Sequence, residues 1–436
     1  MHILYTLYNR LRTSDIVVRL AKGSFWSFTG TAAGKFFVLL TGIICARILG
    51  KEMFGELGIV RSTFNMFIVV GASGIGVTAT RYISAYRKSD PGHAASIYRL
   101  STTFSLVIGI IIAILLLCAS GILSDDYLHS PNLTTSLAMG SIILLICTMN
   151  STENGTLAGM EDFRAIAINT LISSIIESVC MIIGAWLYRI EGAVAGFGLG
   201  VLSLYLLNKR SAIKALKRNG ITTDGRRILP KDWQLIYKYS IPATLSAMTV
   251  TPVFWLLRSM LVRHNGYGDL GVFEAADQWK IVIQFIPTAV CQITLPILSS
   301  IDDNRKFSRT LMGILLLIGG ISAFLALVTL AAAPLLMPLY GNAFTNNTPL
   351  AILALSTIPT AIALVLEMMM YSRDKMWTCL LFNIIWGTAV ILFSYYYLMK
   401  GKGAESLALA ILLAYLIKMA LMGIYFIFMQ NKRTSK

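Results

Sequence analysis

The chain has 436 residues, of which 56% are hydrophobic and only 13% are charged, whereas about 25% of the residues of a typical soluble domain are charged. Because a water-soluble fold cannot bury so much apolar surface, this composition excludes a soluble enzyme, a nucleic-acid-binding module and a disordered chain. The net charge of +16 is expected to reflect the surplus of Lys and Arg that membrane proteins carry on their cytoplasmic side.

Apolar runs bounded by charged residues, Gly or Pro predict about twelve membrane-spanning helices, since one crossing of a bilayer takes about 20 residues. The expected fold class is therefore an all-α polytopic membrane protein. In chain order, the predicted spans are 24–48, 56–80, 97–123, 134–158, 164–187, 190–208, 236–262, 271–299, 310–338, 348–371, 376–399 and 405–429.

A polar segment in the middle of the chain divides these spans into two groups of six. The expected organisation is a cytoplasmic interfacial N-terminus (1–23), an N-terminal six-helix lobe (24–208), a basic cytoplasmic linker (209–235), a C-terminal six-helix lobe (236–430) and a cytoplasmic tail (431–436). Lys and Arg gather in alternate loops, which predicts that the linker and both termini lie in the cytoplasm. The short loops on the other side leave little room for the active site of a membrane enzyme.

The two predicted lobes share a short motif between their first and second spans. When the second half of the chain is placed over the first, the residues that coincide are Arg47 with Arg263, Gly50 with Gly266, and Gly55 with Gly271. The match runs in the same direction in both halves, although so short a match also arises by chance. It predicts two parallel repeats related by an axis along the membrane normal, which is a known plan of transporters.

Motifs of catalysis and cofactor binding are absent from the sequence. There is no Walker A loop, no HExxH and no GxSxG. The six Cys form no CxxC pair, so neither a zinc site nor a disulfide framework is indicated. We therefore expect a protein that is not an enzyme and that has no cofactor and no resident metal.

Three basic residues inside the predicted spans are candidates for an anion-binding cavity, because a charge within the membrane is costly unless it faces a cavity or a partner. Lys35 lies near the middle of its span, and it either binds an anion or forms an ion pair with Glu177. Arg61 either lines a cavity or lies at the interface. Arg258 is near the end of its span, where extension of the side chain to the interface is the alternative.

A second group of charges falls on one face of the predicted span 271–299. Glu274, Asp277 and Lys280 recur every three residues, which places them on the same side of a helix. They form either a polar cavity wall with a protonatable carboxylate for coupling, or a self-neutralising pair of Asp277 and Lys280. Farther along the chain, Lys418 is expected to have an acidic partner, and Glu367 is expected to make gate or loop contacts near the inner surface.

Several stretches resemble the polysaccharide flippases. The segment ICARILGKEMFGELGIVRSTFNMFIVVGASGIGVTATRYIS (44–84) is similar to their first hairpin, 154–168 to their turn between spans 4 and 5, and 295–300 and 338–344 to the ends of their spans 8 and 9. Together the segments resemble the Wzx-type branch of the multidrug/oligosaccharidyl-lipid/polysaccharide exporter superfamily. The matching residues of the first segment are Ala46, Arg47, Leu49, Gly50, Phe54, Gly55, Ser62, Gly74, Arg81 and Tyr82.

The resemblance implies two six-helix bundles arranged in a V. It also implies a flippase that turns undecaprenyl-pyrophosphate-linked repeat units, of O-antigen or a related surface polysaccharide, across the bacterial inner membrane by alternating access. Lys35, Arg61 and Arg258 are then the expected cavity cations that bind the pyrophosphate. Glu177, with the group on 271–299, is the expected polar wall or coupling site.

The same resemblance implies the partners of the protein. They are the lipid-linked oligosaccharide, membrane lipids and the polymerase and chain-length proteins of polysaccharide synthesis, with no nucleic acid. A gradient-driven antiporter of drugs or other small molecules, with the same fold, is the alternative.

Overall fold

The computed structural model describes residues 15–434 except 223–247, 300, 302 and 374. Every regular element among these residues is a helix. In chain order they are α2 (Asp15–Tyr86), α3 (Pro91–Ile122), η1 (Leu123–Tyr127), α4 (Leu133–Gly159), α5 (Phe163–Arg218), α8 (Thr251–Asn265), α9 (Tyr267–Ser299), α10 (Asn304–Leu336), η4 (Met337–Tyr340), α11 (Thr348–Ser372), α12 (Met376–Met399) and α13 (Ala404–Thr434).

Two of these elements are hairpins of two helical arms. The backbone of α2 leaves the helical conformation at Gly50, with φ 77° and ψ 172°, and that of α5 does so at Tyr188 and Arg189. A Cβ on Gly184 would overlap the backbone of Gly192, so the arms of α5 pack closely on either side of their turn. The predicted spans 24–48, 56–80, 164–187 and 190–208 correspond to these four arms.

The membrane-protein fold class predicted from the sequence is confirmed. Among the described residues, eight helical segments are long and apolar enough to cross a bilayer, and both hairpins are among them. The predicted span 271–299 corresponds to α9, which carries Glu274, Asp277 and Lys280 in its first half. Large apolar side chains such as Trp377, which is 84% exposed, cover the outward faces, as expected of a surface in contact with lipid.

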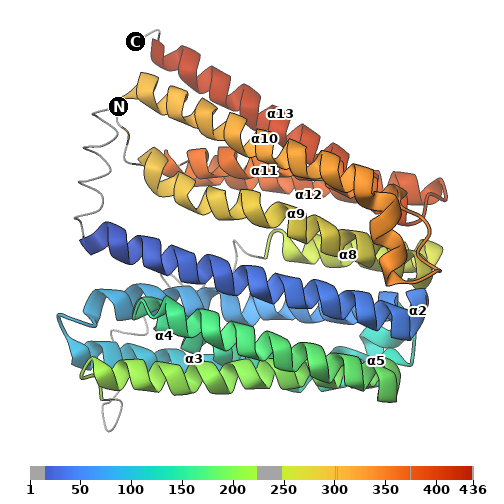
Figure 1. Ribbon diagram of the computed structural model, residues 1–436, viewed down its shortest axis with the longest axis horizontal. Coiled ribbons are helices and arrows are strands. Elements are labelled where there is room, and N and C mark those ends of the chain that lie inside the picture. The colour runs from blue at the N-terminus through green and yellow to red at the C-terminus, as the bar shows by residue number, and fades with distance from the viewer. Residues whose placement is uncertain (1–14, 223–247, 300, 302, 374, 435–436) are drawn as a thin grey trace.

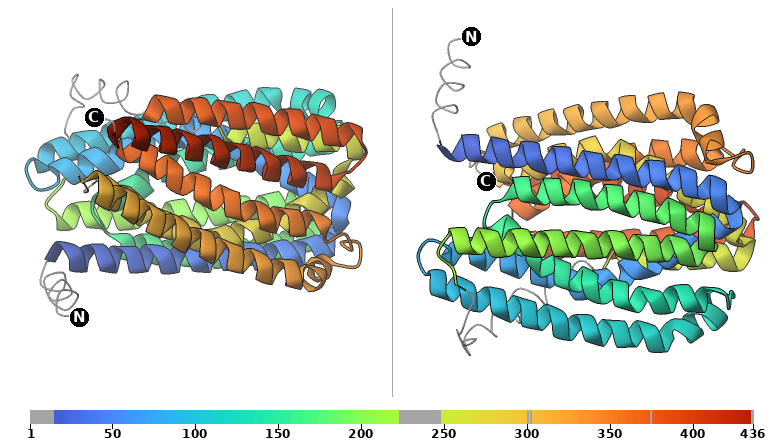
Figure 2. Two further views of the ribbon diagram at one scale, coloured as in Figure 1. Left: turned by 90° about the horizontal axis from the view of Figure 1, so that it is seen from above. Right: turned by 60° about the horizontal axis from the view of Figure 1, so that its bottom comes forward.

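The helices lie side by side along the long axis of the molecule in all three ribbon views (Figures 1 and 2). Figure 1 shows α2–α5, in blue and green, as one group and α8–α13, in yellow to red, as a second group. We call them the N-lobe and the C-lobe. They meet chiefly through α2, which packs against α9, α8 and η4.

The predicted lobe boundaries fall partly outside the described residues. Helix α5 continues to Arg218, so the first part of the predicted linker 209–235 prolongs the last helix of the N-lobe. Residues 223–235 and the first part of the predicted span 236–262 are not described. The stated bounds of the lobes, the linker and the tails therefore stay predictions.

The turns after the first helix of each lobe have the same backbone geometry. Gly50 has φ 77° and ψ 172°, and Gly266, between α8 and α9, has φ 86° and ψ 178°. Glycine adopts such a positive φ without the steric cost of a Cβ. In addition, Asp90 caps α3 and Asp303 caps α10 through their side chains. These equivalences support the parallel repeat that the sequence motif predicts.

Candidate functional site

A cavity of about 400 Å³ lies between the lobes. Both arms of α2 line it from the N-lobe, and α8, α9 and α13 line it from the C-lobe. Its polar lining comes mainly from Arg61, Asn65, Arg258, Glu274, Asp277 and Lys280. The structure thus brings two of the three predicted cations and the whole charged face of α9 to one hollow between the lobes.

Aromatic side chains from both lobes pack beside the cavity, at the end of the molecule that carries the turns at Gly50 and Gly266, which we call the turn end. Phe54, which lines the cavity, has its ring centroid 6.0 Å from that of Tyr340 and 6.1 Å from that of Phe344. All three are almost fully buried. At the turn end, the cavity is therefore bordered by a packed aromatic contact between α2 and the segment that follows α10.

Arg258 is held by two carboxylates of the neighbouring helix. Its Nε donates to Glu274 Oε1 at 2.5 Å, and its Nη2 donates to Asp277 Oδ2 at 3.0 Å. Lys280 Nζ donates to the other oxygen of Asp277 at 3.1 Å, so the predicted pair of Asp277 and Lys280 is present. Removing one member of such a buried network leaves a charge without a partner, which is strongly destabilising. These four residues therefore form a fixed wall of the cavity.

Arg61 is held more loosely. Its Nη2 lies 3.9 Å from Glu177 Oε1, at the limit of an ion pair, and the side chains keep 26% and 20% of their surface exposed. The guanidinium also lies 5.3 Å from the ring centroid of Phe197. The structure thus pairs Glu177 with Arg61, rather than with Lys35 as the sequence alternative had it. A guanidinium has five N–H donors, so Arg61 retains donors for a ligand in the cavity.

Lys35 lies on the face of α2 that is directed toward α9. It is half-buried and lies one turn from Val38, which lines the cavity. On the same helix face, Phe28 contacts Phe285 with 5.0 Å between ring centroids, and Gly42 packs closely against Gln278. The structure shows no ion pair between Lys35 and another described residue.

Among the described residues, the charges that line the cavity and their ion-pair partners balance without Lys35. Three cations, Arg61, Arg258 and Lys280, are paired with Glu177, Glu274 and Asp277. Lys35 adds a positive charge next to this neutral set, on the side away from the turn end. An anion in the cavity would therefore be attracted by Lys35 and by the loosely paired Arg61 more than by the fixed wall.

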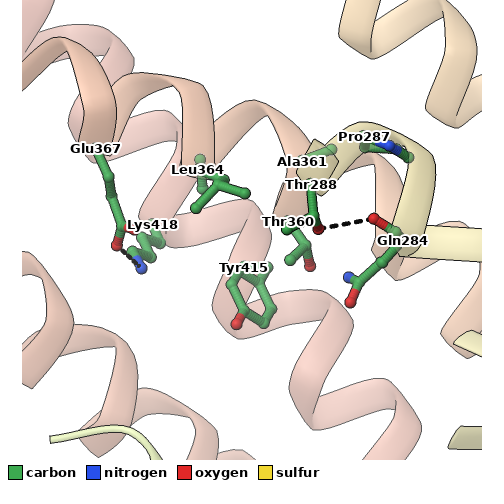
Figure 3. A pocket seen from close by; sticks show the side chains of 10 residues that line it. Gln284, Pro287, Thr288, Thr360, Ala361, Leu364, Glu367, Tyr415 and Lys418 are labelled. Carbon is green, nitrogen blue, oxygen red and sulfur yellow. Dashed lines mark hydrogen bonds and ion pairs between the residues drawn. The ribbon is translucent and has the colours of Figure 1, made fainter. Parts of the chain in front are cut away.

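A second cavity of about 170 Å³ lies within the C-lobe, between α9, α11 and α13 (Figure 3). Lys418 Nζ donates to Glu367 Oε1 at 2.5 Å at one side of it, which gives Lys418 the acidic partner that the sequence predicts. Gln284 and Tyr415 line both cavities, so the two hollows adjoin. The Nε2 atom of Gln284 is buried without a hydrogen-bond partner.

Aromatic rings connect the two groups of buried charge. Trp386 lies 5.7 Å from Phe254 and 5.1 Å from Tyr415, measured between ring centroids. Lys280 Nζ is 5.3 Å from the Phe254 centroid, and Lys418 Nζ is 5.6 Å from the Trp386 centroid. Such cation–π contacts stabilise an ammonium group that is removed from water. The C-lobe side of the site is thus tightly packed around its charges.

Three further residues of the lining, Gln284, Asn65 and Tyr415, were not predicted from the sequence. Gln284 follows Asp277 and Lys280 on α9 at spacings that keep it on the same helix face, so the pattern that identified those residues could also have found Gln284. Nothing in the sequence distinguishes Asn65 or Tyr415 from the other polar and aromatic residues of their spans. Their place in the lining depends on how the helices pack.

Residues 20–302 match the model of a family described as polysaccharide biosynthesis protein. The chain belongs to this family. The relationship suggested by the resemblance of the sequence to polysaccharide flippases is thereby confirmed.

Two curated relatives support this membership of the polysaccharide biosynthesis protein family. The EPS I polysaccharide export inner membrane protein EpsE of Ralstonia nicotianae is 26% identical over 293 residues, which are 64% of this chain. The chain spans 65% of the length of that relative. A putative O-antigen transporter of Shigella flexneri is 25% identical over 309 residues, which cover 68% of this chain and 71% of the relative.

The fold is also that of solved transporters. A multidrug resistance MATE family transporter of the MOP superfamily, described as inward-facing, superposes with a TM-score of 0.76 at 16% identity. The superposition covers 92% of this chain and 96% of the transporter. The chain therefore has a MATE-like fold, in agreement with the two-lobed architecture predicted from the sequence.

Proposed function

We propose that this chain moves undecaprenyl-pyrophosphate-linked oligosaccharide repeat units, of O-antigen or a related surface polysaccharide, across the bacterial inner membrane. The observation that carries the proposal is the cavity between the lobes, in which Arg61 is only loosely paired and beside which Lys35 has no ion pair among the described residues. Membership of the family and the names of the two relatives support a polysaccharide cargo.

The proposed cargo has a doubly phosphorylated headgroup that needs cations. The planar guanidinium of Arg61 can donate two parallel hydrogen bonds to phosphate oxygens, and the ammonium group of Lys35 can bind a phosphate as a compact charge. Electrostatic attraction is less screened inside a membrane protein than in water. In this mechanism the phosphates replace Glu177 as the partner of Arg61, while the lipid tail stays in the bilayer.

Arg258 has a different part in the mechanism. Two carboxylates already hold its guanidinium, so it fixes the shape of the cavity wall together with Glu274, Asp277 and Lys280. Glu177 is the first candidate for binding a coupling proton, because its partly exposed carboxylate loses its cation when Arg61 turns to the phosphates.

In the proposed cycle of alternating access, the turn end faces the periplasm and both chain termini lie in the cytoplasm. Cargo enters from the cytoplasmic side past Phe28 and Phe285, and leaves after the contacts at the turn end separate. The polymerase and chain-length proteins that use the delivered repeat units are the expected partners. The chain is not proposed to catalyse a reaction.

Lys35 provides the test of the proposed function. Lys35→Ala should lower the transbilayer movement of lipid-linked repeat units by at least about tenfold, as expected from the loss of one charged contact, whereas Lys35→Arg should retain part of it. The measurement is the fraction of repeat units that reach the outer leaflet in a strain lacking the native gene. Lys214→Ala, which removes an exposed charge from the end of α5, is the control. Full transport by Lys35→Ala would remove the anion site from the proposal.

A small-molecule antiporter is the second candidate, favoured by the MATE-like fold. Deletion of the gene distinguishes the two functions. Repeat units should accumulate in the inner leaflet if the chain is a flippase, whereas increased drug sensitivity with normal surface polysaccharide would favour the antiporter.

A further inference from the structure

Two arginines join the lobes at the turn end. Arg47, from the first arm of α2, donates through Nε to the carbonyl oxygen of Leu339 at 2.6 Å. Arg263, at the end of α8, donates through Nε to the carbonyl oxygen of Tyr127 at 3.1 Å and through Nη2 to that of Asp126 at 3.3 Å. Each arginine therefore reaches from its own lobe to backbone acceptors of the other lobe.

The two contacts are equivalent under the internal repeat. Arg47 and Arg263 each lie three residues before the positive-φ glycine of their lobe, Gly50 or Gly266. Their acceptors also correspond, because η1 continues α3 in the N-lobe and η4 continues α10 in the C-lobe. One interaction thus occurs twice, once in each direction across the lobe boundary.

The acceptors explain why an arginine is suited to each position. The last carbonyl groups of a helix lack partners within the helix, and the end of the helix carries a partial negative charge. A guanidinium supplies several donors in a rigid plane. Since these carbonyls receive hydrogen bonds from the opposite lobe, the bonds exist only while the lobes are together at the turn end.

A pair of glycines allows the backbones to meet beside the arginines. A Cβ on Gly55 would overlap the carbonyl oxygen of Tyr267, and a Cβ on Gly271 would overlap the carbonyl oxygen of Lys51. The contact is again reciprocal, from α2 to α9 and from α9 to α2. The motif that both halves of the sequence share therefore lies at the turn end, where its arginines and its second glycines make the contacts between the lobes.

We propose that Arg47 and Arg263 form a two-part latch that holds the turn end shut and that must release before the cavity can open on that side. This inference rests on the alternating access of the proposed function. The two arginines are gating residues and do not bind cargo, since neither lines the cavity between the lobes. Each half of the latch contributes independently, because each has its own acceptors.

The accessibility of the cavity from outside the cell tests the latch. Asn65 is exposed and lines the cavity, so Asn65→Cys, in a chain whose six native cysteines are replaced by alanine, reports the opening of the turn end to a membrane-impermeant maleimide. Arg47→Ala and Arg263→Ala should each raise the labelling rate about fivefold, and together about 25-fold, as expected for two independent hydrogen bonds at an exposed site.

Lys400→Ala is the matched control for these variants. It removes a positive charge from the loop between α12 and α13, where Lys400 contacts Tyr396 of its own lobe, and it should leave the labelling rate unchanged. An unchanged rate in the double arginine variant would overturn the latch. A rate increase that comes entirely from one arginine would overturn its two-part character.

A cross-link keeps the test decisive if the alanine variants are poorly folded. Arg47→Cys with Leu339→Cys can be joined by a thiol cross-linker that a reductant cleaves. Before cross-linking, Asn65→Cys should label as fast as in Arg47→Ala, with labelling read on the peptide that carries position 65. Labelling should fall to the parent rate once the pair has been joined and recover after cleavage. The same treatment of Arg47→Ala with Asn65→Cys, which lacks the pair, should leave labelling fast and so shows that the cross-linker does not simply cap the reporter. Labelling that stays fast in the cross-linked protein would contradict the latch.

Transport is measured separately in the same variants. The labelling experiment needs no cargo, so a latch that behaves as expected in a chain that moves no repeat units would reject the proposed function and keep the latch. Normal transport of repeat units with no change in labelling would reject the latch and keep the proposed function.

Discussion

The two lobes share one plan but carry their charges differently. In the N-lobe, Arg61 and Glu177 are 3.9 Å apart and remain partly exposed. In the C-lobe, Arg258 is within 3.0 Å of two carboxylates, and Lys418 is 2.5 Å from Glu367. One side of the cavity is therefore fixed by internal ion pairs, while the other retains a cation that can change its partner.

Repeat-equivalent positions make the contrast sharper. Under the correspondence of Gly50 with Gly266, Arg61 of the second arm of α2 corresponds to Asp277 of α9. A cation in one lobe thus corresponds to an anion in the other, although the helices that carry them are equivalent. The two halves of the chain therefore share their backbone geometry but differ in the charges that they place along the cavity.

The largest effect is expected from Arg258→Ala, which removes the central cation of the ion-pair network in the C-lobe. It leaves Glu274 without a cation, and the loss of one partner of a buried ion pair costs about 3–5 kcal/mol. The free energy of unfolding in detergent, or the melting temperature, measures it. Arg258→Met combined with Glu274→Gln should recover much of the loss. A single variant as stable as the parent would show that the network does not hold the C-lobe together.

A smaller loss of stability is expected when either glycine at the turn end is replaced by alanine, and the effect should be similar in the two lobes. Gly55→Ala and Gly271→Ala each place a methyl group against a carbonyl of the other lobe, and overpacking of this kind costs about 1–3 kcal/mol. Both should open the turn end and raise the labelling of Asn65→Cys to a similar degree. Gly313→Ala, at a helical position with no atom near the added methyl group, is the control. Unequal effects would show that the reciprocal contact is stronger in one direction.

The smallest effect on stability is expected from Arg61→Ala. A partly exposed ion pair contributes about 1 kcal/mol or less, so the melting temperature should change little. Transport of repeat units should nevertheless fall at least about tenfold, because a charged hydrogen bond to the cargo is lost. A large loss of stability without a specific loss of transport would show that Arg61 has a structural role like that of Arg258, and would contradict its assignment as a cargo-binding residue.

The sequence predicted the spans well because each membrane crossing needs a long apolar run. The predicted spans 134–158, 348–371 and 376–399 lie within one or two residues of α4, α11 and α12. The turns at Gly50 and Gly266 were also visible as a repeated motif. Hydrophobic length and backbone geometry are local properties, so a single sequence carries them.

The partners of the buried charges could not be predicted in the same way. The sequence suggested Lys35 for Glu177, but the packing of α2 against α5 places Arg61 there instead. Arg258 was expected either to bind an anion in a cavity or to extend to the membrane interface. The packing of α8 on α9 places it in the cavity lining but holds it between Glu274 and Asp277. Which helices touch, and at which rotation, is a tertiary property that one helix does not reveal.

The central position of α2 makes its contact with the C-lobe a possible target for inhibitors. This one hairpin supplies most of the N-lobe surface that meets the C-lobe, and it extends from the Phe28–Phe285 contact to the aromatic contact around Phe54. A rigid hydrophobic compound wedged along the seam between α2 and α9 would therefore block the relative movement of the lobes. Under the proposed function, such a compound would inhibit surface glycan assembly without imitating a sugar or a phosphate.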